Sequence, residues 1–75
     1  MGLPVVSGRR VIKVLTRAGF AVVGRRGSHV RLKKVADRVY IVVVPDHREL
    51  ARGTLLSVIR QAGLTREEFL ALLEK

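Results

Sequence analysis

Apolar residues near the start of the chain recur at the spacing of one helix face, at Val11, Ile12, Leu15 and Ala18. Ser7, which precedes them, is a favourable N-cap residue because its hydroxyl can accept a hydrogen bond from a free backbone N–H. Gly19 can adopt the left-handed conformation that ends many helices, with Phe20 placed to fold back on the last turn. The pattern predicts a helix over residues 8–18.

Three segments rich in β-branched and aromatic residues follow, at residues 20–26, 28–34 and 38–44. Gly27 marks the first turn between them, and residues 35–37 form the second. Because consecutive strands joined by short turns pair side by side, the segments predict an antiparallel meander with the second strand in the middle.

Two further helices are predicted after the strands. Pro45 ends the third strand ahead of a polar loop, and apolar residues recur at helical spacing over residues 53–62. A capping box of Thr65 and Glu68 then opens a last helix. The order α-β-β-β-α-α predicts a single α+β domain over residues 1–75, a three-stranded antiparallel sheet with its helices on one face.

Alternation along the strands predicts which side chains point away from the helices. Val30 and Leu32 are the apolar positions of the second strand, so they should face the helices. The opposite face of that strand then carries His29, Arg31 and Lys33. With Phe20 and Val22 inward on the first strand, the residues beside this basic row are Ala21, Val23 and Arg25. The pattern predicts an uncovered sheet face on which a histidine lies among cationic side chains.

The third strand is apolar on both faces, with the run Val39-Tyr40-Ile41-Val42-Val43-Val44. A sheet with helices on one side needs apolar residues on that side only. Either the last helix or a loop covers the other face, or a partner protein docks there by strand addition or by contact with the sheet face. The sequence leaves both explanations open.

The distribution of charge points to a polyanionic partner. The formal net charge is +9, and residues 1–36 hold nine Lys and Arg and no acidic residue, whereas residues 37–75 hold six of each sign. A nucleic acid is the simplest partner for this distribution of positive charge. The alternative is that the basic residues form a solvated surface that binds no ligand. The sequence has no cysteine, no basic amphipathic helix and no apolar run of about 20 residues. We therefore expect a cytoplasmic protein that does not bind a membrane.

His29 and its neighbours carry the groups needed to cut RNA without a metal. An imidazole exchanges protons near neutral pH, so His29 can act as a general acid or a general base. Arginine and lysine bind phosphate, and the candidates for holding the RNA are Arg25, Arg26, Arg31 and Lys33. Gly27, which lacks a side chain, lets the RNA backbone approach closely.

His47 is the other histidine of the chain, in the sequence Pro45-Asp46-His47-Arg48. It is a candidate for the second group of an acid–base pair, and a cap or bridge within its loop is the structural alternative. The two separated histidines and scattered carboxylates match no metal-ligand spacing, and there is no glycine-rich phosphate loop or nucleophile elbow. No metal or other cofactor is predicted.

A series of short motifs runs through nearly the whole chain: Leu3-Pro4-Val5-Val6-Ser7-Gly8, Ala18-Gly19-Phe20, Gly27-Ser28-His29, Val44-Pro45 followed by His47, Leu50-Ala51-Arg52-Gly53-Thr54-Leu55, and residues 59–69. Their order and spacing together resemble the HicA toxins, the YcfA-like group of mRNA interferases. The resemblance implies a double-stranded-RNA-binding-like fold, ribosome-independent cleavage of mRNA, and growth arrest that a HicB antitoxin neutralises. It places the family's catalytic histidine at His29 and its glycine at Gly27.

The chain departs from this resemblance at one turn. Family members commonly have a tight, glycine-containing turn between the second and third strands, where this chain reads Lys34-Val35-Ala36-Asp37-Arg38. Two other functions also remain open. A non-catalytic RNA-binding module of the same fold would need a lysine cluster after the sheet, where residues 47–53 are mixed in charge. A protein that only binds another protein would leave the basic first half without a purpose.

Overall fold

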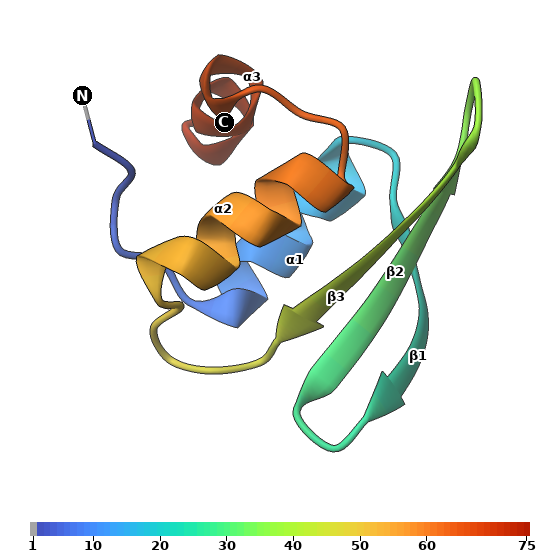
Figure 1. The fold of residues 1–75 in the computed structure, drawn as a ribbon, viewed down its shortest axis with the longest axis horizontal. Coiled ribbons are helices and arrows are strands. Elements are labelled where there is room, and N and C mark those ends of the chain that lie inside the picture. Colours follow the sequence, from blue (N-terminus) through green and yellow to red (C-terminus); the bar gives the residue numbers. More distant parts are fainter. Residues whose placement is uncertain (1) are drawn as a thin grey trace.

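The computed structural model describes residues 2–75. Its elements are α1 (Gly8–Arg17), β1 (Ala21–Arg26), β2 (His29–Val35), β3 (Val39–Pro45), α2 (Arg52–Gln61) and α3 (Arg66–Leu73) (Figure 1). The predicted element order and the α+β class are confirmed. The predicted limits of the first five elements differ from the observed ones by at most one residue.

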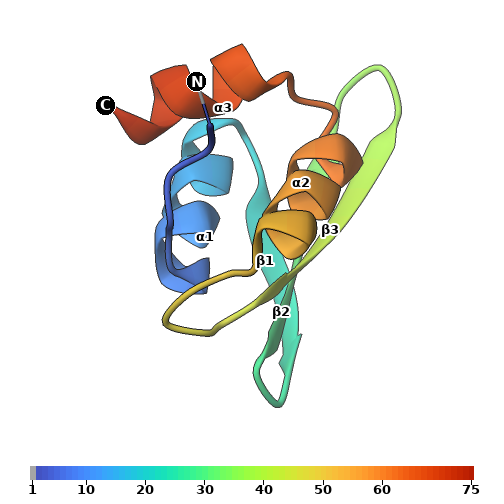
Figure 2. The same ribbon diagram turned by 60° about the vertical axis from the view of Figure 1, so that its left-hand side comes forward.

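The three strands form one antiparallel sheet in the order β1-β2-β3. Helices α1 and α2 lie on one face of this sheet, and α3 packs on α1 (Figure 2). The largest fully buried side chains of the core are Val11, Val14, Leu15, Val30, Leu32, Val42, Val44, Leu55, Val58 and Phe69. In residues 2–75, no helix has the length and apolar character needed to cross a membrane.

The predicted caps of α1 and α3 are present. Ser7 Oγ accepts a hydrogen bond from the backbone N–H of Arg10 at 3.0 Å. Thr65 and Glu68 form a reciprocal capping box, in which each side chain accepts from the other residue's backbone N–H, at 2.8 Å and 3.0 Å. These side chains satisfy N–H groups that have no partner within the helix, so polar residues at these positions define where the helices begin.

The pairing of β1 with β2 contains a β-bulge at Val23. Val22 pairs with Leu32 and Gly24 pairs with Arg31, so Val23 is the extra residue of the bulged strand. Because side chains alternate between the two faces of a strand, one inserted residue exchanges the faces of all the residues that follow it.

The bulge corrects the prediction for Arg25. Arg25 pairs with Val30 and therefore lies on the helix side of the sheet, whereas strict alternation placed it beside His29. Arg26 pairs with His29 and occupies that place instead. Val22 lies on the predicted side but is 52% exposed, as is typical of β1, an edge strand whose residues are all exposed.

The outer face of β3 is uncovered. Val42 and Val44 are buried, whereas Val39, Ile41 and Val43 are 55%, 45% and 37% exposed. Helix α3 packs on α1 and not on this face. The explanation that the last helix or a loop covers the strand is therefore wrong for the part of the chain that the structure describes.

Two arginines of α1 hold the end of α3. Arg10 Nη2 donates a hydrogen bond to the carbonyl oxygen of Leu73 at 2.9 Å, and Arg17 Nη1 donates to that of Leu72 at 3.2 Å. The last carbonyls of a helix lack intrahelical partners and lie at the negative end of its dipole, so guanidinium groups stabilise them. These two cations of the basic first half thus contribute to the fold.

Candidate active site

The turn between β1 and β2 places His29 at the start of β2. Gly27 has a φ of 60°, and no non-glycine residue among residues 2–75 has a positive φ. A positive φ at only the first central position is typical of a two-residue hairpin turn that begins with glycine. A Cβ at position 27 would meet no atom within 4 Å, so backbone conformation alone requires glycine there.

The side chains of β2 alternate as predicted. His29, Arg31 and Lys33 are exposed, whereas Val30 and Leu32 are buried. Residues directly opposite each other on antiparallel strands share one face of the sheet. The partners of the exposed residues on β1 and β3 therefore belong to the same open surface.

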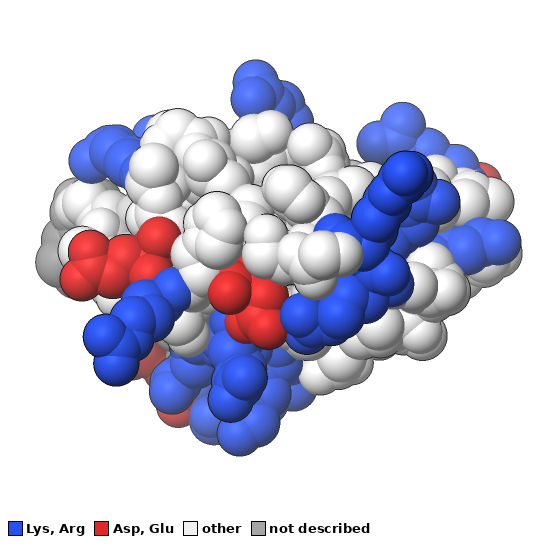
Figure 3. All heavy atoms as spheres, turned by 90° about the horizontal axis from the view of Figure 1, so that it is seen from below, with Lys and Arg blue, Asp and Glu red and all other residues white. Residues whose placement is uncertain are grey.

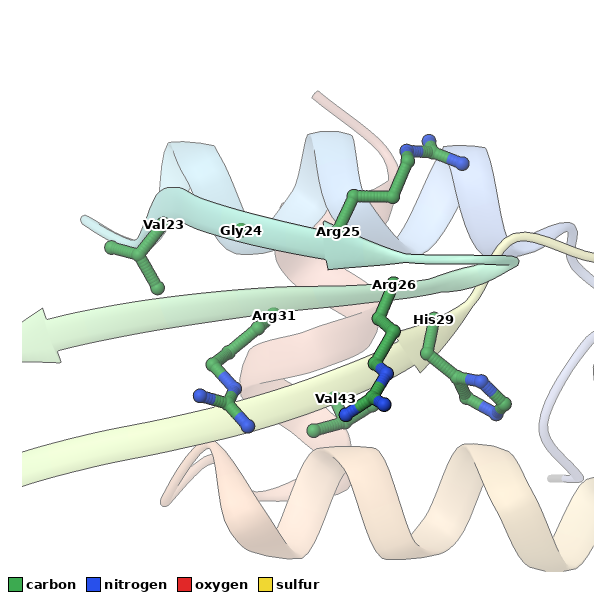
Figure 4. Close-up of a pocket in the computed structure, with 7 residues that line it drawn as sticks. All are labelled: Val23, Gly24, Arg25, Arg26, His29, Arg31 and Val43. Atoms are coloured by element: carbon green, nitrogen blue, oxygen red, sulfur yellow. The ribbon is translucent and has the colours of Figure 1, made fainter.

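A shallow hollow of about 480 Å³ lies on this open face beside His29. Its lining residues are Val23, Gly24, Arg25, Arg26, His29, Arg31 and Val43. Arg26 lies opposite His29, while Gly24 and Val43 lie opposite Arg31 on its two sides. Figure 4 shows the side chains of Arg26, Arg31 and His29 projecting from one side of the sheet, with Val43 beside the two guanidinium groups.

Two predicted phosphate-binding residues lie outside this group. Arg25 borders the hollow, but its side chain points away from the other labelled side chains (Figure 4). Its Nη2 forms an ion pair with Asp46 Oδ2 at 3.0 Å. Lys33 lies farther along the sheet, opposite Ala21 and Ile41, and does not line the hollow. The structure thus brings Arg26 and Arg31 to His29.

His47 lies in the loop that follows β3, with its ring against the β1–β2 turn. The distance between His47 Nε2 and Ser28 Oγ is 3.5 Å. The backbone carbonyl of His47 accepts a hydrogen bond from the N–H of Gly8 at 2.8 Å, and the N–H of Asp46 donates to the carbonyl of Ser28 at 2.6 Å. The loop is therefore tied to both the turn and the start of α1.

Comparison with known protein families shows which family the chain belongs to. The family model described as the HicA toxin of bacterial toxin–antitoxin systems matches residues 8–64, a range that holds every residue lining the hollow. The chain belongs to the HicA toxin family. No curated protein matches it in a sequence search.

Figure 3 views this HicA toxin from the end that carries the β1–β2 turn and the loop after β3. Among the charged side chains on this surface, the basic ones predominate, and a few acidic side chains lie directly beside them. Within residues 2–75 the ion pair is that of Arg25 with Asp46, so the charges of Arg26 and Arg31 are available to an anionic ligand. The His, Asp and Glu side chains of these residues form no group of three that could hold a metal ion.

The sequence candidates for the site of this HicA toxin lacked two residues that line the hollow, Gly24 and Val43, and Val23 was predicted only to lie beside the basic row. Gly24 carries a signal that could have found it, because an isolated glycine inside a strand pattern often marks a bulge or a close backbone approach. Val43 is one of several valines in an apolar run, and only the pairing of β3 with β2 distinguishes it.

Proposed function

We propose that this HicA toxin is a metal-independent endoribonuclease that cleaves mRNA, with His29 as a general acid or general base. The observation that carries the proposal is the exposed imidazole of His29 on an open sheet face, with Arg26 directly opposite and Arg31 two residues along the strand. An exposed histidine in this position has no packing role. Its neighbours are the cations that bind a phosphodiester.

In the proposed reaction, the ribose 2′-hydroxyl attacks the adjacent phosphorus. A base removes the proton of that hydroxyl, the bond from phosphorus to the 5′-oxygen breaks, and an acid protonates the departing 5′-oxygen. His29 performs one of these two transfers, a contribution of typically about 10²–10⁴-fold in rate. Arg26 and Arg31 stabilise the negative charge that develops on the phosphoryl oxygens.

His47 is our candidate for the second proton transfer. Its ring contacts the hydroxyl of Ser28, the residue that precedes His29 in the chain. The open space around Gly27 leaves the turn between these groups accessible to an RNA backbone. Lys33 lies beyond Arg31 on the same face, where it extends the cationic surface for the phosphates of the RNA.

The proposal is tested by incubating the purified protein with RNA in the presence of a chelator. We expect the wild type to cleave and His29→Ala to lose cleavage while its circular dichroism spectrum and thermal unfolding stay unchanged, because the side chain is exposed. The His47→Ala variant is measured in parallel. Retained cleavage by His29→Ala, or a strict requirement for magnesium, would contradict the proposal. Binding of RNA by a wild type that does not cleave it would support the non-catalytic RNA-binding module.

The proposed cellular function is that of a cytoplasmic toxin whose partner is a HicB-like antitoxin protein. We propose that the antitoxin covers either His29 or the exposed apolar side chains of β3. Expression of the wild type in a bacterial host should arrest growth, and co-expression of the antitoxin should restore it. Expression of His29→Ala should have no effect on growth. Growth arrest by His29→Ala would separate toxicity from the proposed cleavage.

A further inference from the structure

We infer that the hollow beside His29 seats one nucleobase of the RNA, next to the phosphate that is cut, and that Gly24 keeps this subsite open. The inference rests on the proposed nuclease function and adds a position for the substrate. It is carried by the pairing of the strands, by the apolar walls of the hollow and by the free space above Gly24.

The open face near the turn has two successive rows of residues across the strands. The first row holds Arg26, His29 and Pro45, and the second holds Gly24, Arg31 and Val43. Two residues along a strand cover roughly 6.6 Å, which is on the scale of one nucleotide. A phosphate bound at the first row therefore places an adjacent nucleoside over the second row.

The side chains in and beside the second row suit a base better than a phosphate. Val23 and Val43 are 54% and 37% exposed, and they give the hollow an apolar side. The guanidinium plane of Arg31 can stack on the face of a base, as arginine does where proteins recognise single-stranded RNA. The unpaired charges of Arg26 and Arg31 favour a ligand that also carries phosphate.

Gly24 is the residue whose lack of a side chain leaves this space free. Gly24 lies directly opposite Arg31, so a Cβ at position 24 would point to the open face. That Cβ would meet no atom within 4 Å, and the backbone there does not have a positive φ. Glycine weakens a strand interior, and the fold imposes no steric need for it at this position. The role we assign to Gly24 is to let the base lie close to the backbone of β1.

The experiment changes two things independently. A side chain is added to the protein at position 24, and a single base is removed from the RNA. Cleavage by the wild type is first mapped on a defined RNA. The variants Gly24→Ala, Gly24→Val and Gly24→Leu are then compared on that RNA and on two RNAs that lack the base on either side of the cut bond. Gly53→Leu is the matched control, because Gly53 lies on α2 and a Cβ there also meets no atom within 4 Å.

We expect Gly24→Leu to lower kcat/KM on the intact RNA by about 10- to 100-fold, the range expected for the loss of one stacked base. Gly24→Ala should have a smaller effect, and Gly53→Leu none. On one of the two abasic RNAs, wild type and Gly24→Leu should differ by less than about twofold, because the side chain then occupies a space that the missing base has left. Thermal unfolding should show that Gly24→Leu is at least as stable as the wild type.

Wild-type cleavage by Gly24→Leu, or an equal loss on intact and abasic RNAs, would overturn the subsite and leave the nuclease function standing. If the wild type does not cleave, the same comparison is made by fluorescence anisotropy with a 2′-O-methyl oligonucleotide that contains or lacks one base. A binding penalty of Gly24→Leu that disappears without the base would then support the subsite alone. Equal binding by all variants would overturn it.

Discussion

Arg26 lies directly opposite His29 across the β1–β2 hairpin. This pairing exists because Val23 is bulged out of the ladder, which turns Arg26 to the open face and Arg25 to the helix side. Arg25 instead forms its ion pair with Asp46 in the loop after β3. Two adjacent arginines therefore have different roles, one beside the imidazole and one in anchoring a loop.

This difference predicts unequal effects of the two arginines on RNA cleavage. We expect Arg26→Gln to lower kcat/KM at least about tenfold, because a hydrogen bond to a charged group typically contributes about 1.5–3 kcal/mol. Arg25→Gln should change it by less than about threefold. The slope of log affinity against log salt should fall by about 0.7 for each single-stranded phosphate contact that is lost, and only in the Arg26 variant. Equal losses in both variants would show that the orientation set by the bulge does not decide which of the two arginines contacts the phosphate.

The start of α1 is packed so closely against the end of β3 that position 8 has no room for a side chain. A Cβ at Gly8 would collide with the backbone carbonyl of Pro45, and the N–H of Gly8 already binds the carbonyl of His47. We expect Gly8→Ala to destabilise the protein by about 2–3 kcal/mol, measured by urea unfolding, because the backbone of the loop must move. Gly53→Ala is the control and should be neutral or stabilising by up to about 1 kcal/mol. A stable Gly8→Ala variant would be inconsistent with this contact.

Arg10 and Arg17 should stabilise α3 without taking part in cleavage. Their guanidinium groups bind the carbonyls of Leu73 and Leu72 at the end of α3. We expect each alanine substitution to destabilise the protein by about 1 kcal/mol and to speed hydrogen exchange in α3 more than in the strands. Lys13→Ala, on the same helix, serves as the control. A loss of kcat/KM with unchanged exchange would instead indicate that these arginines contact RNA.

The exposed apolar side chains of β3 should matter for the proposed antitoxin and little for stability. Ile41 is 45% exposed on the open face, opposite Lys33. We expect Ile41→Lys to weaken antitoxin binding at least about tenfold by calorimetry, because a lysine places a charge within an apolar contact. Val5→Lys is the control, since Val5 is 74% exposed and lies outside the sheet. Unchanged binding by Ile41→Lys would indicate that the antitoxin covers the area around His29 instead.

Local patterns were sufficient to predict the elements and the orientation of β2. Helix spacing, caps and turn glycines act within a few residues, so the limits of the strands and of α1 and α2 could be read to within one residue. The alternation of Val30 and Leu32 with His29, Arg31 and Lys33 was also correct, because β2 is the central strand and must bury one face. The same rule failed on β1 after Val23, where the bulge breaks the period.

By itself, the sequence determined the α+β order of elements, the basic character of the first half and the outward position of His29, because each depends on short-range periodicity or on composition. Only the tertiary structure decided that Arg26 and not Arg25 faces His29, that the ring of His47 meets Ser28, and that the side chain of Ile41 stays exposed. These relationships depend on register and on the packing of distant segments. One extra residue in an edge strand changes them without changing the hydrophobic pattern that specifies the fold.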